Sequence, residues 1–162
     1  HLEFFMPYDS KAYLSTPSST STEALGVVGE IREYIDATYG KQFYRLVKNT
    51  SGSDIAANLA VVYASGSSVN CALSGDEAAA ATVAGITQNI IPATHYAWVC
   101  CGGACKATSG AAIAANALVT TDGTAGLVDD NTTTGIEHCI IGVAPSAFSG
   151  ATTGTLRLRG LM

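Results

Sequence analysis

The sequence is poor in charged residues. Of its 162 residues, 13% are charged and 7% aromatic, while 48% are hydrophobic. In a typical soluble domain about a quarter of the residues are charged, so the charged fraction of this sequence is roughly half of the usual value. Ser, Thr, Asn and Gly must cover much of the surface in place of charge, and such a surface suits burial against neighbours. The composition favours a component of an assembly, and a secreted β-protein with a neutral surface is the alternative.

Basic clusters and long apolar stretches are also missing. The net charge is −5 and no basic run occurs, so the sequence lacks the electrostatic footprint of a nucleic-acid-binding protein. No apolar stretch approaches the roughly 18 residues that span a bilayer. Residues 1–15 mix acids with aromatic residues and do not have the pattern of a signal peptide. We therefore expect neither nucleic acid nor a membrane as a partner.

Recognisable catalytic motifs are absent from the sequence. There is no GxSxG elbow and no phosphate-binding glycine loop followed by lysine. A hydrolase built from Cys101, with His95 or His138 and with Asp122, is conceivable, but no protease signature surrounds these residues. The acid pair 129–130 lies in an expected surface loop. We predict that the protein is not an enzyme and takes no cofactor.

Five cysteines raise the question of a metal site or a disulfide framework, and they stand at Cys71, Cys100, Cys101, Cys105 and Cys139. An odd number argues against a complete disulfide framework. Structural zinc sites favour CxxC pairs with nearby histidine, whereas the spacing here is CCxxxC. Cys100 and Cys101 are adjacent in an expected strand, so that their side chains point to opposite faces and at most one can join Cys105. We predict free thiols that fill small spaces in the core, without a metal.

Short β-type runs separated by turn residues dominate the sequence from residue 26 onward. In residues 26–52, Val27, Ile31 and Ile35 recur at helical spacing, but a hairpin with the turn DATYGK explains more of the alternation and is favoured. Runs such as YAWVCC and HCIIGVA then alternate with Gly, Ser, Asn and Asp turns. The pattern predicts an all-β fold, a small β-barrel or β-sandwich over residues 26–162.

The first 25 residues differ from the rest. Aromatic residues are followed by the Ser/Thr/Pro tract STPSSTSTE, which cannot build a core of its own. Left in water, Phe4, Phe5, Tyr8 and Tyr13 would form a sticky apolar surface. We predict that residues 1–25 form an extended N-terminal arm and that these aromatics bind a partner or a neighbouring subunit. A disordered terminus is the alternative.

One short phrase occurs twice. The run IAAN followed by an apolar strand stands at residues 55–58 and again at residues 113–116. Asparagine tolerates the left-handed backbone conformation that a sharp bend into a strand requires. The repeat therefore predicts one turn-into-strand device used twice, with Asn58 and Asn116 in left-handed or tight-turn conformations. Chance similarity in an alanine-rich chain is the alternative.

Trp98 is the sole tryptophan and alternates with Tyr96 in the run THYAWVCC. Both side chains are therefore expected on one face of a strand. They either pack in the core or form an aromatic pair that faces a ligand or partner.

Several phrases in order resemble the head-decoration (cement) proteins of tailed bacteriophages. They are Ala84-Gly85, Ile91-Pro92-Ala93, Tyr96 to Val99, Ile113 to Val119, Asp122-Gly123, Ile141 to Ala144 and Leu156 to Gly160. The segment GEIREYIDATYGKQFYRLVKNTSGSDIAAN resembles the amino-terminal hairpin of phage relatives. The similarity covers about 80% of the chain. Asn58 and Asn116 stand where the family favours glycine, and asparagine is the next-best residue for a left-handed backbone.

The resemblance implies a virion protein on the outer surface of an icosahedral head, assembled in the host cytoplasm. Its partners would be the major capsid protein, whose subunits it would bridge, and neighbouring copies of itself, with a trimer favoured over a dimer. The alternative function is a host- or glycan-binding β-module of a phage tail or fibre, which an exposed Trp98 and Tyr96 would favour.

Overall fold

In the computed structural model, the chain is described over residues 16–64, 70–73, 82–122, 126–130 and 137–161. Among these residues, strands make up nearly all of the regular structure, together with the short 3-10 helix η2 (Glu137–Cys139). The strands are β1 (Thr20–Ser21), β2 (Ile31–Asp36), β3 (Gly40–Asn49), β4 (Ala60–Tyr63), β5 (Asn70–Leu73), β6 (Val83–Thr87), β7 (Tyr96–Thr108), β8 (Leu118–Thr121), β9 (Val128–Asp130), β10 (Gly142–Val143) and β11 (Thr153–Leu158). The predicted all-β fold is confirmed.

The predicted hairpin is formed by β2 and β3, which pair antiparallel from Ile31↔Arg45 to Asp36↔Gly40. The Asp36 carboxylate accepts hydrogen bonds from two backbone amides of the turn, at 2.7 and 2.8 Å. Lys41 Nζ lies 3.1 Å from a carboxylate oxygen of Glu33 across the pair. Strand alternation, and not the helical spacing of the apolar residues, therefore describes this segment.

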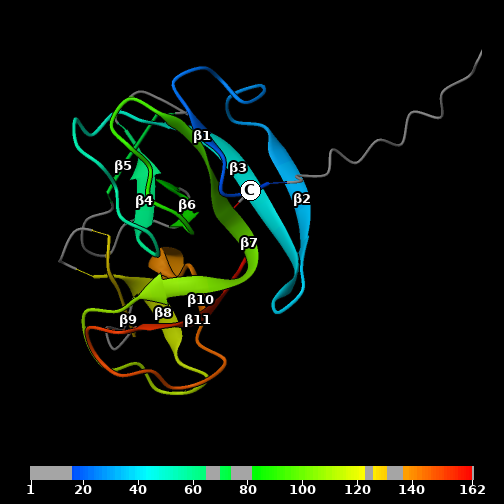
Figure 1. Cartoon of the computed structure of the whole chain (residues 1–162). Coiled ribbons are helices and arrows are strands. Elements are labelled where there is room, and N and C mark those ends of the chain that lie inside the picture. Colours follow the sequence, from blue (N-terminus) through cyan, green and yellow to red (C-terminus); the bar gives the residue numbers. More distant parts are fainter. Residues whose placement is uncertain (1–15, 65–69, 74–81, 123–125, 131–136, 162) are drawn as a thin grey trace, which may run out of the picture.

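The pairings of β3, β5, β4, β6 and β7 form a closed ring. β3 pairs parallel with β5, the next three contacts are antiparallel, and β7 returns to β3 in antiparallel register. We call this ring the first barrel; it forms the upper part of the molecule in Figure 1. One separate core cluster gathers inward-facing side chains of its strands and two flanking isoleucines, and consists of Val47, Ile55, Val61, Ala84, Ile91, Ala97 and Val99.

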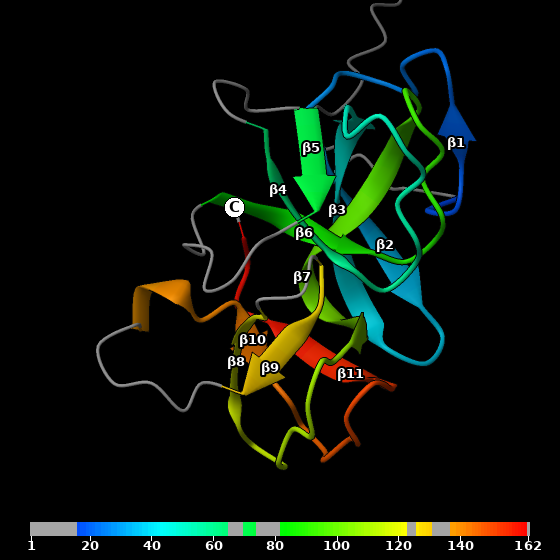
Figure 2. The same ribbon diagram turned by 90° about the vertical axis from the view of Figure 1, so that its left-hand side faces the viewer.

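A second ring follows the first and shares β7 with it. β7 pairs with β11, β11 with β10, β10 with β8 and β8 with β9. A parallel bridge between Ser109 and Val128 connects β9 back to the end of β7. We call this ring the second barrel. Figures 1 and 2 show β7 running from the upper part of the molecule into the lower part, where β8 to β11 lie.

The two barrels form an internal duplication, and the repeated IAAN phrase is the part of it that is recognisable in the sequence. Many residues from 48 to 61 recur 58 positions later, as Asn58 and Asn116 show. The identical ones are Lys48, Thr50, Ser51, Gly52, Ile55, Ala56, Ala57, Asn58 and Val61. The same offset maps β4 onto β8, and the pair Val61↔Gly85 corresponds to Val119↔Gly142, where the two glycines stand 57 positions apart. β7 is thus the last strand of one unit and the first strand of the next.

The turn-into-strand device occurs four times in the described part of the chain. Its left-handed residues are the four described non-glycine residues with positive φ: Asn58 and Asn116 at 64°, Thr94 at 65° and Ala151 at 55°. Each lies three residues after an apolar residue in an isolated β-bridge. These bridges join the devices in pairs, as Ile55↔Ile91 and Ile113↔Phe148. The prediction for the two asparagines is confirmed, and the device is a corner of each barrel.

We expect Asn58→Val and Asn116→Val to lower the free energy of unfolding by roughly 1–2 kcal/mol each, because a β-branched residue resists the left-handed conformation. The backbone amides of both asparagines donate hydrogen bonds of 2.7 Å across their corners, to Thr87 O and Ala144 O, so the chain has no freedom to avoid the strain. Urea unfolding measures the effect. Asn→Gly at the same positions is the control and should stay near wild-type stability. Equal stability of the valine and glycine variants would contradict the interpretation.

No helix in the described residues is long and apolar enough to cross a membrane.

Candidate functional site

The predicted contact residues of the arm, Phe4, Phe5, Tyr8 and Tyr13, lie outside the described residues. Their role stays a prediction, as does the division into an arm of residues 1–25 and a barrel domain of residues 26–162. Within the predicted arm, β1 pairs with the start of β7, through Thr20↔Ala97 and Ser21↔Tyr96.

A β-bulge brings the clustered cysteines together. Tyr44 pairs with Cys100 but its neighbour Phe43 pairs with Gly102, so Cys101 is an extra residue in β7. The bulge breaks the simple alternation, and Cys100, Cys101 and Cys105 all belong to one core cluster. The prediction that Cys100 and Cys101 point to opposite faces, with at most one of them near Cys105, assumed a regular strand. That assumption does not hold at the bulge.

The described cysteines are buried free thiols. Cys100, Cys101 and Cys105 are fully buried and Cys139 nearly so. Burial raises the pKa of Cys101 to about 12, although the nearby Arg45 opposes the shift. The pKa of Cys105 is also raised, first by a hydrogen bond with Cys100 and then by burial. Because the thiolate is the reactive and metal-binding form, these groups are inert at neutral pH. They pack the core, as predicted.

Native protein at neutral pH should therefore react with a thiol reagent at no more than one cysteine, Cys71, whose side chain lies outside the described residues. All five should react after denaturation. The raised pKa values of Cys101 and Cys105 mean that these two thiols stay protected in the native protein until the pH is strongly alkaline. Mass spectrometry after iodoacetamide treatment gives the count, and metal analysis provides an independent check. About one zinc per chain would contradict this reading.

The structure separates two of the conceivable hydrolase residues, His95 and Cys101. His95 and Cys101 stand six residues apart along extended chain, which is about 20 Å at the rise of a strand. His95 Nδ1 lies 2.9 Å from the carbonyl oxygen of Ala93, and Cys101 is buried with a raised pKa. His138 lies in η2. Among the described residues, no group of three or more His, Cys, Asp or Glu side chains is placed so that it could hold a metal ion.

Trp98 packs in the core. It is 3% exposed and belongs to the larger core cluster, and the Arg32 guanidinium lies 4.9 Å from the centre of its ring. Tyr96 is half-buried, with Lys48 Nζ 5.2 Å from the centre of its ring. The two aromatics therefore do not form an exposed binding pair.

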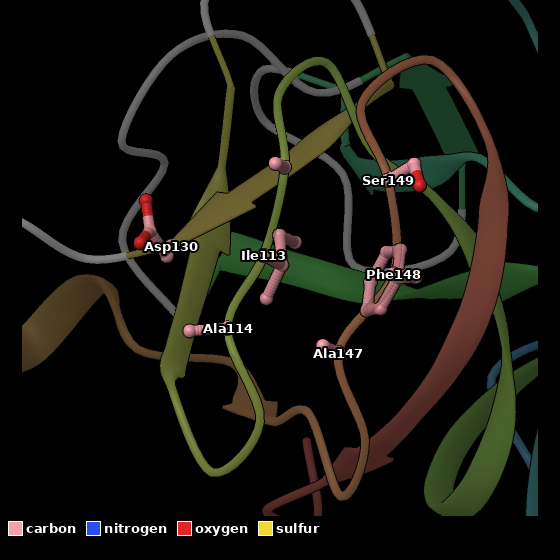
Figure 3. A pocket seen from close by; sticks show the side chains of 7 residues that line it. Ile113, Ala114, Asp130, Ala147, Phe148 and Ser149 are labelled. Carbon is pink, nitrogen blue, oxygen red and sulfur yellow. The ribbon is translucent and has the colours of Figure 1, made fainter.

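A shallow hollow of about 410 Å³ lies at the corner pair of the second barrel. Figure 3 shows Ile113 and Phe148 facing each other between the two chain segments, with Asp130 at one side. The lining residues are Ala112, Ile113, Ala114, Asp130, Ala147, Phe148 and Ser149. Asp130 is the sole titratable group among these seven. Such a lining offers an apolar contact with one negative charge, and no base or second acid for acid–base chemistry.

The surface around this hollow carries no charge over long stretches. Residues 107–121 and 140–156 contain no Asp, Glu, Lys or Arg. Exposed alanines of both corners line it, and Leu118 is 45% exposed. Small uncharged residues lose little side-chain entropy and little hydration when a neighbour covers them. This end of the second barrel is therefore suited to contact with another protein.

Comparison with known proteins found similarity among solved structures. No family model and no curated protein matches the sequence. Among solved structures, the chain is similar to the head fiber gp8.5 N base in bacteriophage phi29, with a TM-score of 0.55 and 13% identity. The similarity covers 71% of this chain and 93% of that chain. It shows a shared fold.

Proposed function

We propose that the protein is a structural component of a phage virion that binds the outer surface of the head and bridges major capsid subunits. The observation that carries the proposal is the fold shared with the base of a phage head fiber. The ordered phrases that resemble head-decoration proteins support it independently, because the structural comparison rests on 13% identity and not on those phrases.

The proposed mechanism is binding and not catalysis. A protein that binds the assembled shell but not its free subunits stabilises the shell by mass action. Many modest contacts, multiplied by the symmetry of the head, give a large total effect. The low charge and the uncharged end of the second barrel suit such contacts. In this proposal the partners are the major capsid protein and further copies of the chain.

The tail- or fibre-borne glycan-binding module has less support. An aromatic pair exposed in a groove would have favoured it, but Trp98 is buried and Arg32 covers its ring.

Heads assembled without the protein provide the direct test. Purified protein should bind such heads to a saturating, fixed ratio and raise the temperature at which they release DNA. An equal amount of protein unfolded by urea and then diluted is the control for non-specific adsorption. Binding to tails but not to heads would overturn the proposal in favour of the alternative.

A further inference from the structure

The duplication gives each barrel an equivalent cross-strand row of residues, and the two rows lie in different environments. In the first barrel, Tyr44 pairs with Cys100, Cys100 with Ile86 and Ile86 with Ala60. These four side chains are at most 3% exposed. We call this set the first row; it lies on the outer face of the first barrel, opposite the separate cluster that fills it.

The second barrel covers the first row. Cys105, in the part of β7 that pairs with β11, is fully buried in the same core cluster as Cys100. At the other end, the amide of Ala60 donates a 2.7 Å hydrogen bond to the carbonyl of Gly126, between β8 and β9. The row and the interior of the second barrel belong to a single core cluster. A unit of this fold therefore has an outer row that is buried by another unit of the same fold.

The corresponding row of the second barrel is open. Ala104 pairs with Arg157, Arg157 with Val143 and Val143 with Leu118. The strand pairings relate the two rows: Ala60, Ile86 and Cys100 pair in series as Leu118, Val143 and Arg157 do, at offsets of 58, 57 and 57 residues. Leu118 is 45% exposed, Arg157 is exposed, and Ala104 and Val143 are half-buried. We call these four residues the second row. β11 ends at Leu158, and the chain then returns to the first barrel, where the Leu161 amide donates to Cys101 O, so no third unit in the described chain covers it.

We infer that the second row is the surface through which one copy of the chain binds a second copy. The covered first row shows which partner such a row accepts, a unit of the same fold. The positive charge of Arg157 in the second row also agrees with this partner. The two ion pairs among the described residues, Arg32–Glu30 and Lys41–Glu33, do not include Arg157. A chain with 13 acidic and 8 basic side chains has carboxylates to offer it.

The inference rests on the proposed function, because it assigns a surface to the self-association of the chain. It is tested in solution, without heads, so that its failure can be told apart from a failure of the proposed function. Sedimentation equilibrium of the full chain should show reversible self-association. Leu118→Glu should weaken it by about tenfold or more, as expected when a charge replaces an apolar side chain in a contact. Arg157→Glu, an exposed substitution that leaves the fold intact, should weaken it as well. Val27→Glu and Ile35→Glu are the controls, since these residues are 74% and 57% exposed on other surfaces.

Wild-type protein that stays monomeric at all concentrations would overturn the inference, as would association that Leu118→Glu and Arg157→Glu leave unchanged. If the controls weaken association as much, the contact is not confined to the second row and the inference is equally wrong. Binding to heads is measured separately. A monomeric protein that still saturates heads would overturn this inference alone, and if Leu118→Glu then lost head binding, the row would belong to the capsid contact.

Discussion

Gly142→Ala is expected to lower the free energy of unfolding by about 3 kcal/mol or more, at the upper end of what overpacking costs. A Cβ atom at Gly142 would lie 2.5 Å from the carbonyl oxygen of Arg157 and 3.0 Å from a methyl carbon of Leu156. The carbonyl belongs to the paired backbone of β10 and β11, so it cannot rotate away without breaking the ladder.

The duplication predicts the same cost at the equivalent glycine. A Cβ atom at Gly85 would lie 2.5 Å from the carbonyl oxygen of Cys100, the residue that corresponds to Arg157. Gly85→Ala should therefore destabilise the protein at least as strongly as Gly142→Ala, because Gly85 also has a φ of 157°, which residues with a side chain rarely adopt. The matched control is Gly40→Asn, in the hairpin turn, where no atom lies within 4 Å and asparagine tolerates the φ of 71°. It should change stability by about 0.5 kcal/mol or less.

Thermal and urea unfolding of the three variants measure these effects. Gly→Ala variants as stable as Gly40→Asn would contradict the close strand approach at both sites. If Gly85→Ala alone were destabilising, the two barrels would not be equivalent units, and the covered first row would not indicate what binds the second row.

Deleting residues 1–15 is expected to leave the barrels folded and to weaken attachment to heads on the order of a hundredfold. The deletion ends before β1, which pairs with β7 and remains in the shortened chain. Burial of each aromatic side chain at an interface contributes roughly 1.5–3 kcal/mol by area. The cost of ordering the arm reduces this sum, so the net effect is smaller than four such contributions.

The measurement is paired. Thermal unfolding of the isolated truncated protein should match that of the full chain, while its occupancy on heads at equal concentration should fall. Replacing Phe4, Phe5, Tyr8 and Tyr13 by serine in the full-length chain is the control that separates the aromatics from the length of the arm. Full occupancy without residues 1–15 would show that the arm does not hold the protein on the head. An unfolded truncated protein would show that residues 1–15 belong to the core.

The sequence predicted those parts of the fold that depend on local patterns. The hairpin of β2 and β3 follows from alternation and from a turn with Asp36 at its start. The left-handed backbone of Asn58 and Asn116 follows from the tolerance of asparagine for that region. Thr94 and Ala151 adopt the same conformation without such a side chain, because the equivalent bridges at Ile91 and Phe148 impose the corner. Their conformation depends on partners far away in the sequence.

The closure of the two barrels was not predictable for a similar reason. Asn49↔Cys71 and Ser109↔Val128 are parallel contacts that close the rings, and nothing in either local segment specifies its partner. The bulge at Cys101 likewise depends on the opposite strand. The 58-residue repeat alone does not identify the second row, because the offset shortens to 57 for the residues paired in β6 and β7, and only the structure shows that the first row is covered.

The central claim is that the protein belongs to the surface of a phage head. Quantitative mass spectrometry of purified virions from the phage that encodes it, with tails removed in a parallel sample, tests this most directly. The account predicts a fixed, high ratio of the protein to the major capsid protein, unchanged by removal of the tails. Absence from virions, or a few copies per particle that are lost together with the tails, would contradict it.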